Sequence, residues 1–263
     1  MIERVLITGA AGSIGRALRS GLRGQYAHLR LLDVTPQQAA EPGEEVLTVD
    51  LNDRLATEAA MKDVDAVIHL AAVASEAPFD EILSGNITTT YSLFEGARRA
   101  GVRRVVFAST NHVIGFYPRG ETVGPDDPVR PDTFYGVSKA FGEALGRLYA
   151  DKYGLEVVCL RIGSFAERPT TTRQLSIWLS PRDCVQLVRC SLDAPAVGFT
   201  LVYGVSANTR SWWEDDAAAS LGYRPQDDAE QFAAQIEEPS PGAPSRLGER
   251  LQGGSFVEED PLR

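Results

Sequence analysis

The sequence has few cysteines and no apolar stretch long enough to cross a membrane. Its 263 residues include three cysteines, Cys159, Cys184 and Cys190, without the spacing of a metal site. We therefore expect no metal, and interpret the cysteines as buried thiols in a reducing compartment. No segment approaches about 18 apolar residues without charge, so no membrane span is expected. Residues 1–7 run directly into an apolar strand without the features of an export signal. We therefore expect a cytoplasmic protein.

Positive charge is also scarce. Lys and Arg number 26 against 36 Asp and Glu, which gives a net charge of −10. This balance argues against nucleic acid or an anionic membrane surface as a partner. It also constrains an anionic substrate, because the overall field of the protein would not attract one. A specific buried arginine would have to do so.

Apolar runs alternate with helical patterns along most of the chain. Runs too apolar for half-exposed strands predict buried parallel strands, at residues 2–8, 29–33, 46–49, 66–70, 104–109, 156–162 and 199–203. The helical patterns lie at about residues 13–23, 53–61, 80–100, 134–153, 181–193 and 212–221. In the third of these helices, Ile87, Tyr91 and Phe94 are expected to form one apolar stripe. The alternation predicts an α/β protein with a doubly wound parallel sheet, the Rossmann fold.

The regular alternation weakens after about residue 165. We expect one domain over residues 1–263, with a dinucleotide-binding core at 1–163. Residues 164–263 are expected to supply a substrate loop, a late sheet strand and a small lobe over the carboxyl ends of the strands. Trp212 and Trp213 are adjacent, and we expect them to anchor a late helix to the core rather than to stack on a ligand.

A glycine-rich turn follows the first strand and opens the first helix. Gly9, Gly12 and Gly15 allow the turn, the close approach of a pyrophosphate and the packing of helix on strand. Ser13 and Ile14 belong to the same turn, at a helix N-terminus whose partial positive charge favours phosphate. The sequence therefore predicts a dinucleotide site.

An acidic residue at the end of the second strand indicates which dinucleotide is bound. The Asp33 carboxylate can accept both ribose hydroxyls and repels a 2′-phosphate, which favours NAD over NADP. Asn86 is expected to hold backbone or a water molecule beside the cofactor rather than to touch substrate. The other predicted cofactor contacts are Asp50 and Leu51 near the adenine, Leu70, Ala71 and Ala72 near the ribose and nicotinamide, Lys139 and Ile162.

A hydroxyl, a phenol and an ammonium group follow at the spacing of a reaction site. Tyr135 and Lys139 are four residues apart in a helical segment, so both project from one face. A free phenol has a pKa of about 10, and we expect the ammonium and the nicotinamide charge to lower it. Tyr135 would then take a proton while hydride leaves the same carbon. Thr110, at the end of the fifth strand, can hydrogen-bond the same oxygen.

These motifs resemble the extended short-chain dehydrogenase/reductases. The resemblance covers essentially the whole chain. More specific segments resemble bacterial uronate dehydrogenases. These are residues 107–112 (FASTNH), 135–139 (YGVSK), 161–164 (RIGS), 252–256 (QGGSF), and Asn208 leading to Trp212 and Trp213.

The resemblance implies NAD-dependent oxidation of the anomeric carbon of galacturonate or glucuronate to an aldarolactone, which opens to the aldaric acid. It implies that Tyr135 is the base, that Thr110 takes the hydroxyl role and that Lys139 orients cofactor and phenol. It places Asn111, His112, Ser164 and Arg173 at positions that hold the sugar acid. Extended members commonly form homo-oligomers, which leaves the number of subunits open.

The sequence departs from the family pattern in two places. Ala74 stands where serine is common, with Ser75 beside it as a substitute contact, and Thr110 replaces the more usual serine. Both changes leave the preferred uronate open. Arg173 lies in an irregular segment where a substrate-covering loop is expected, and its guanidinium matches a carboxylate in bidentate fashion. His112 is interpreted as a substrate hydrogen-bonder without a proton-transfer role.

Two other functions would fit part of the sequence. A nucleotide-sugar epimerase or dehydratase resembles the cofactor half of the chain. Such enzymes usually carry a larger, more basic C-terminal lobe, and a dehydratase would want an acidic pair where Asn111 stands. A non-catalytic NAD(H)-sensing module is the second alternative. Such modules generally lose the tyrosine or the lysine, and both are retained here.

Overall fold

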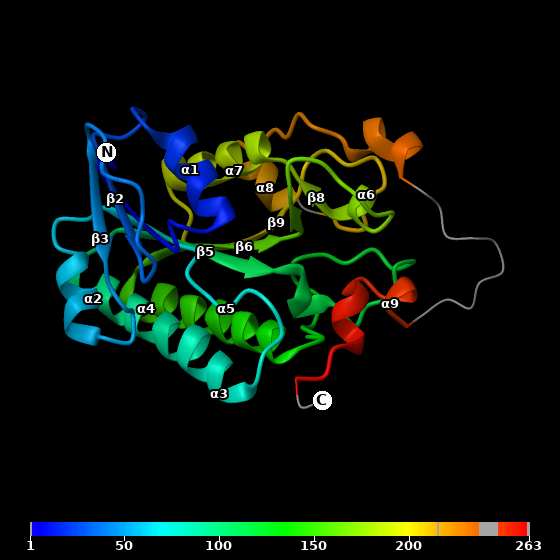
Figure 1. Cartoon of the computed structure of the whole chain (residues 1–263), viewed down its shortest axis with the longest axis horizontal. Coiled ribbons are helices and arrows are strands. Elements are labelled where there is room, and N and C mark those ends of the chain that lie inside the picture. The colour runs from blue at the N-terminus through cyan, green and yellow to red at the C-terminus, as the bar shows by residue number, and fades with distance from the viewer. Residues whose placement is uncertain (1, 215, 237–246, 262–263) are drawn as a thin grey trace.

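A sheet of seven parallel strands forms the centre of the molecule (Figure 1). The computed structural model describes residues 2–214, 216–236 and 247–261. Within them the strand order is β3-β2-β1-β4-β5-β6-β9. The strands are β1 (Arg4–Thr8), β2 (His28–Asp33), β3 (Glu44–Thr48), β4 (Ala66–His69), β5 (Arg104–Thr110), β6 (Glu156–Ile162) and β9 (Phe199–Gly204). The order reverses between β1 and β4, which is where a doubly wound fold binds its ligand. The predicted fold class is confirmed.

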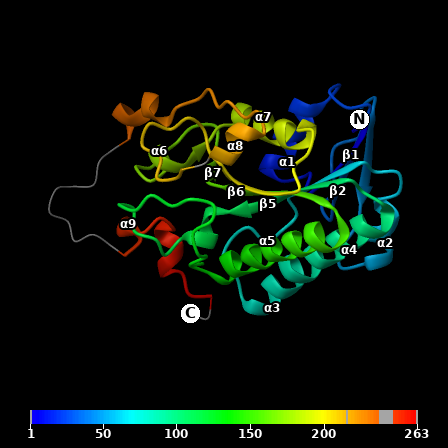
Figure 2. The ribbon, with the colours of Figure 1, turned by 180° about the vertical axis from the view of Figure 1, so that it is seen from behind.

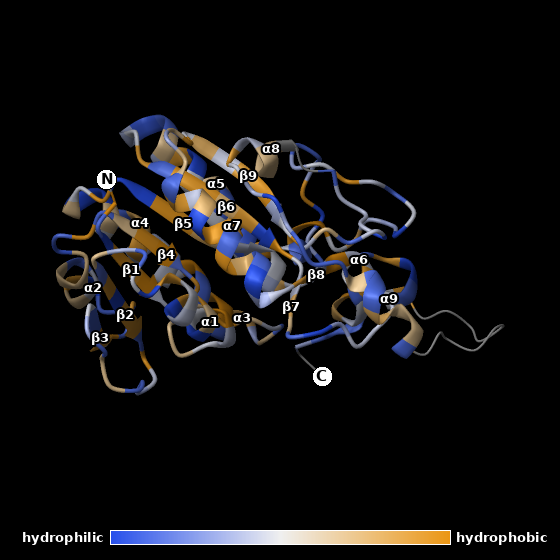
Figure 3. Ribbon diagram, turned by 90° about the horizontal axis from the view of Figure 1, so that it is seen from above, coloured by the Kyte–Doolittle hydropathy of each residue, from blue (hydrophilic) through white to orange (hydrophobic). Residues whose placement is uncertain are grey.

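The central strands are buried because helices cover both faces of the sheet. All seven residues of β5 are buried, and β4 is buried throughout. Figure 3 shows the resulting apolar colouring of the inner strands. The predicted strands agree with the observed ones to within about two residues at most ends. Near-continuous apolar runs are what two covered faces require.

Two helical layers enclose the sheet (Figures 1 and 2). One face carries α1 (Ser13–Leu22) and α7 (Pro181–Asp193), which contact each other. The other face carries α2 (Arg54–Ala60), α4 (Thr89–Ala100) and α5 (Phe134–Tyr153). Each layer has its own apolar core, with Leu18 and Leu187 on the first face and Phe94 and Tyr149 on the second.

The predicted helix at residues 80–100 is interrupted. The chain forms α3 (Phe79–Ile82), the π-helical turn η1 (Leu83–Thr88) and then α4. A π turn holds one more residue than an α turn and rotates the residues before it relative to those after it. The expected stripe of Ile87, Tyr91 and Phe94 is therefore wrong. Phe94 is buried, but Tyr91 is 40% exposed and Asn86 points inward instead.

The later part of the chain adds small elements beyond the carboxyl ends of the strands. β7 (Ser164–Phe165) pairs with β8 (Trp178–Leu179), and short helical segments accompany them. These segments are α6 (Gln174–Ile177), α8 (Asp216–Ser220), η3 (Ala229–Gln235), α9 (Leu247–Arg250) and η4 (Gly254–Glu258). Among the residues that the structure describes, no helix is long and apolar enough to span a membrane.

The two adjacent tryptophans lie outside the helix in which they were expected. The predicted helix 212–221 is wrong at its start, since α8 spans Asp216–Ser220 and residue 215 lies outside the described residues. Trp213 forms a bridge with Val123 and stacks on Tyr203 with ring centroids 4.7 Å apart. At 8% exposure it is a core residue, so the expected packing role is confirmed for Trp213.

Candidate active site

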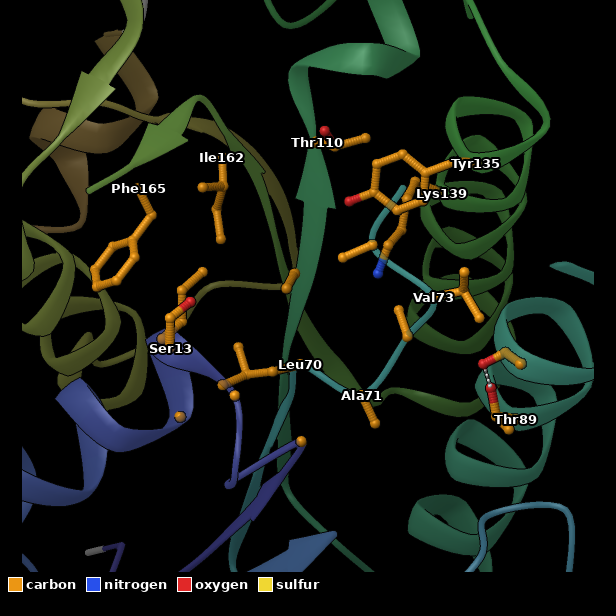
Figure 4. Close-up of a pocket in the computed structure, with 18 of the residues that line it drawn as sticks. Ser13, Leu70, Ala71, Val73, Thr89, Thr110, Tyr135, Lys139, Ile162 and Phe165 are labelled. Carbon is orange, nitrogen blue, oxygen red and sulfur yellow. Dashed lines mark hydrogen bonds between the residues drawn. The ribbon is translucent and has the colours of Figure 1, made fainter. Parts of the chain in front are cut away.

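A cavity of about 910 Å³ opens at the carboxyl ends of the central strands. Of the residues predicted to act in catalysis or to bind cofactor or substrate, only Ser75 and Asn86 do not line it. Its walls hold the glycine turn, Asp33 and Asp50 at one end, and Asn111, His112 and Arg173 at the other. Tyr135 and Lys139 lie between these ends, as Figure 4 shows for the central part of the cavity.

The glycine turn leaves room for a phosphate because side chains could not fit there. Gly9 has a φ of +69°, and a Cβ on it would lie 2.7 Å from the Ala71 backbone nitrogen. A Cβ on Gly15 would overlap the carbonyl oxygen of Gly9. The turn therefore approaches β4 closely and opens α1 with free N–H groups at its N-terminus. These residues fit the pyrophosphate of a dinucleotide.

Asp33 connects the glycine turn to the end of β2. Its Oδ2 accepts a hydrogen bond from the Ala11 nitrogen at 2.9 Å, and its Oδ1 accepts one from the Thr35 nitrogen at 2.9 Å. Each carboxylate oxygen can accept further bonds, and Asp33 lines the cavity beside the turn. This position suits a residue that reads ribose hydroxyls next to the pyrophosphate.

Asn86 supports the cavity wall from behind. Its Oδ1 accepts from the Val73 nitrogen at 2.7 Å, and its Nδ2 donates to the Val73 oxygen at 3.0 Å and to Ser138 Oγ at 2.9 Å. The side chain is 2% exposed and its hydrogen bonds go to the protein. It thus ties the loop after β4 to α5. Ser75, in the same loop, is exposed and does not reach the cavity.

The phenol of Tyr135, the ammonium of Lys139 and the hydroxyl of Thr110 meet in the middle of the cavity (Figure 4). Tyr135 and Lys139 project from the first turns of α5, whose N-cap Thr133 accepts a hydrogen bond from the Gly136 nitrogen at 3.0 Å. Thr110 ends β5 and lines the cavity beside the Tyr135 phenol. Lys139 Nζ lies 5.0 Å from the centre of the Phe107 ring and 5.8 Å from that of Tyr135.

Burial governs the titration of both groups. It raises the pKa of Tyr135 to about 12, against the opposing effect of the Thr110 hydroxyl and with a further contribution from the negative Asp132. Burial lowers the pKa of Lys139 to about 8. The lowering of the phenol pKa that we expect from the ammonium and the nicotinamide charge together stays a prediction, because in the protein without cofactor burial is the largest influence on this pKa.

Arg173 supplies a partly buried guanidinium at the far end of the cavity. Its Nε donates to the Gln252 carbonyl oxygen at 2.7 Å. With the Asn111 amide oriented so that its nitrogen donates to the Ile162 oxygen, the Asn111 oxygen accepts from Arg173 Nη2 at 2.7 Å. Burial, together with the positive Arg119, lowers the pKa of Arg173 to about 10. Among the described residues Arg173 forms no ion pair with a carboxylate.

His112 also lines the cavity and is held from two sides. Its Nδ1 lies 2.8 Å from Asp132 Oδ2, and its ring stacks on Phe256 with centroids 3.9 Å apart. The tilted ring of Tyr135 is 6.0 Å away. Ser164 also lines the cavity, and its Oγ accepts a hydrogen bond from Gln174 Nε2 at 2.7 Å.

Several residues that shape this end of the cavity had no predicted role in the site, although Gln252 and Phe256 belong to the segment 252–256 that carries part of the family resemblance. Phe165 and Phe256 line it, Gln252 orients Arg173 through its carbonyl oxygen, and Asp132 orients His112. Asp132 directly precedes the N-cap of α5. An acidic residue there is typical of any helix start, so its position in the sequence carried no functional signal.

Comparison with known proteins agrees with this arrangement. A model of the NAD dependent epimerase/dehydratase family matches residues 5–176. The chain belongs to this family. A uronate dehydrogenase of Pseudomonas putida is 46% identical over 99% of this chain and 97% of its own.

Two solved structures extend the comparison. The first is a uronate dehydrogenase variant from Agrobacterium tumefaciens, complexed with NAD. It is 43% identical, with a TM-score of 0.94 over 99% of this chain and 99% of its own. The second is a glucuronic acid dehydrogenase from Chromohalobacter salexigens. It is also 43% identical, with a TM-score of 0.96 over 100% of this chain and 99% of its own.

Proposed function

We propose that this protein is an NAD-dependent dehydrogenase that oxidises the anomeric carbon of a hexuronate, galacturonate or glucuronate. The product is an aldarolactone, which opens to the aldaric acid. Similarity over the full chain to uronate dehydrogenases and to an NAD complex supports the assignment. The three free cysteines, two of them buried, support a reducing cytoplasm as its location.

The observation that carries the substrate assignment is the position of Arg173. A guanidinium that has lost water and has no acidic partner among the described residues is costly to keep. Two of its donors are used by Gln252 and Asn111, which leaves three of five free. They line the same cavity as the Tyr135 phenol. A substrate carboxylate would pair with the arginine and place the rest of the sugar near Tyr135.

The reaction itself needs a base beside the hydride acceptor. Bound NAD+ would accept the hydride from the anomeric carbon and bring a positive ring near the phenol, which favours phenolate. Tyr135 would accept the proton of the anomeric hydroxyl, so that the carbon becomes the lactone carbonyl. Thr110 would hydrogen-bond the same oxygen. Lys139 would position the cofactor and the phenolate, and Asp33 would bind the adenosine ribose.

A screen of sugar acids with NAD tests this function. Galacturonate and glucuronate should each produce NADH, measured by absorbance, while galactose and glucose should not. Equal turnover of glucose and glucuronate would rule out carboxylate recognition. The result also separates the proposal from a nucleotide-sugar epimerase, which would leave NAD unreduced overall.

A pair of arginine variants tests the carboxylate contact. Arg173→Gln should lower kcat/KM for galacturonate by about a hundredfold or more, because the lost bonds are to a charged group. Arg168→Gln is the matched control, since Arg168 is exposed in the same segment and does not line the cavity. A similar loss in both variants would contradict the assignment.

We also propose that the protein forms a homo-oligomer. Apolar side chains are exposed along the helices of one layer, where Leu83 and Tyr91 are 40% exposed, Val137 44% and Leu148 49%. A second copy would cover this face. Sedimentation of the intact protein tests the proposal, with Leu83→Glu expected to shift the molecule to monomer. A monomer at micromolar concentration before substitution would contradict it.

A further inference from the structure

We propose that Asp132 is a positioning residue that fixes one tautomer of His112, so that the imidazole accepts a hydrogen bond from a hydroxyl of the bound sugar acid. The inference rests on the proposed function for the identity of the ligand. The tautomer itself is a property of the protein and is testable without substrate.

The contact between the two side chains is short and dry. Asp132 Oδ2 lies 2.8 Å from His112 Nδ1, with the carboxylate fully buried and the imidazole side chain 9% exposed. The backbone supports the same pairing, because the Asp132 nitrogen donates to the His112 carbonyl oxygen at 3.2 Å. Phe256 stacks on the ring and restrains its rotation.

The carboxylate determines which nitrogen carries the proton. An ionised carboxylate only accepts hydrogen bonds, so Nδ1 must donate to it. In the neutral imidazole, Nε2 then holds a lone pair and acts as an acceptor. His112 lines the cavity, and its Nε2 has no hydrogen-bond partner among the described residues. A sugar hydroxyl is the donor that this nitrogen suits.

The surroundings prevent Asp132 from serving another group. Its Oδ1 accepts a hydrogen bond from Thr133 Oγ1 at 3.0 Å. Gly115 and Gly253 lie against the carboxylate so closely that a Cβ on either would overlap it. The charge of Asp132 raises the pKa of Arg173, but the hydrogen bonds of Arg173 go to Gln252 and Asn111. Asp132 therefore stays with His112, and the free donors of the arginine stay available to a substrate.

Nitrogen-15 NMR of the unliganded protein tests the tautomer directly. The chain has three histidines, so the His112 signals are assigned by their loss in His112→Gln. The intact protein at pH 8 should show a protonated Nδ1 and an unprotonated Nε2. Asp132→Asn should reverse this pattern, because the asparagine amide can donate to Nδ1. A protonated Nε2 in the intact protein would overturn the proposal.

A double-substitution cycle tests whether Asp132 acts through His112. Asp132→Asn should lower kcat/KM for galacturonate by about tenfold to a hundredfold, with NAD affinity measured by fluorescence unchanged. In a protein that already carries His112→Gln, Asp132→Asn should lower kcat/KM by less than about threefold. Asp126→Asn, an exposed change in the same connection, is the control. The proposal would be overturned if Asp132→Asn lowered kcat/KM as much in the His112→Gln protein as in the intact protein. Failure of every uronate to react in the intact protein would refute the proposed function instead.

Discussion

Lys139 and Arg173 are both cations without a carboxylate partner among the described residues. Burial lowers the pKa of Lys139 to about 8 and that of Arg173 to about 10. Such groups reduce the stability of the fold, because each must give up water without gaining a counter-ion. Strongly shifted pKa values inside a cavity are typical of functional sites. At the residue scale, these two cations therefore lower the stability of the fold and are kept because the site needs them.

Lys139→Met should raise the stability of the protein and abolish its activity. Lowering the pKa from 10.5 to about 8 corresponds to about 3 kcal/mol in favour of removing the charge, so Tm should rise by several degrees. Above pH 8 the folded lysine loses its proton before the unfolded one does, and the stability of the original protein rises. The difference in the free energy of unfolding between Lys139→Met and the original protein should therefore become smaller from pH 7 to pH 10, as measured by denaturation. A difference that does not change with pH would contradict this account.

Asp33→Ala should weaken NAD binding and relax the rejection of NADP. The carboxylate at the end of β2 can accept ribose hydroxyls and would repel a 2′-phosphate. We expect the ratio of kcat/KM for NAD to that for NADP to fall at least tenfold. Asp50→Asn, at a residue that lines the same cavity and is predicted to lie near the adenine, should leave the ratio within about twofold. An unchanged ratio in Asp33→Ala would show that another residue reads the ribose.

At the scale of elements, the π-helical turn η1 determines where Asn86 points. An insertion in the helical ladder was not visible in the sequence, because the apolar spacing before and after it also fits a continuous α-helix. The buried strands were predictable, since each is a short run of apolar residues between turn signals. The two-residue strands β7 and β8 were not, because they are too short to show any period.

Asn86→Ala should destabilise the loop after β4. The substitution leaves the N–H and C=O of Val73 without their partners, at a cost of about 2 to 4 kcal/mol. Because Val73 lines the cavity beside Lys139, KM for NAD should rise as well. Calorimetry and initial rates check both effects. Thr88→Ala, an exposed change in the same turn, should alter neither, and an unchanged KM in Asn86→Ala would mean that the loop keeps its position without the amide.

At the scale of the whole molecule, the net charge of −10 opposes the approach of an anionic substrate. Salt screens this long-range repulsion over about 10 Å at 0.1 M, but acts less on a buried arginine. The KM for galacturonate at saturating NAD should therefore fall or stay within about twofold between 0.02 and about 0.3 M salt. A steep rise in KM would indicate attraction by the surface field instead, and the rate without galacturonate at each salt concentration provides the baseline.

The cofactor half of the site could be predicted because its groups follow successive strands. The carboxyl ends of parallel strands lie at the same edge of the sheet. Residues at these ends, such as Asp33 and Thr110, therefore line one cavity regardless of the conformation of the connecting loops. The substrate end depends on contacts between distant segments. The Arg173 bond to Gln252 spans 79 residues and the Asp132 bond to His112 spans 20. No local pattern encodes such pairings, so the contacts of Asp132, Gln252 and Phe256 emerged only from the structure, although residues 252–256 belong to the family resemblance.

Gln252 and Phe256 come late in the chain, yet they touch Arg173 and His112. During synthesis on a ribosome, every group of the glycine turn and of Asp33 emerges long before them. The substrate end of the cavity is therefore complete only once residues 252–256 have packed against Arg173 and His112, whereas the glycine turn and Asp33 are joined by a contact within the first βαβ unit.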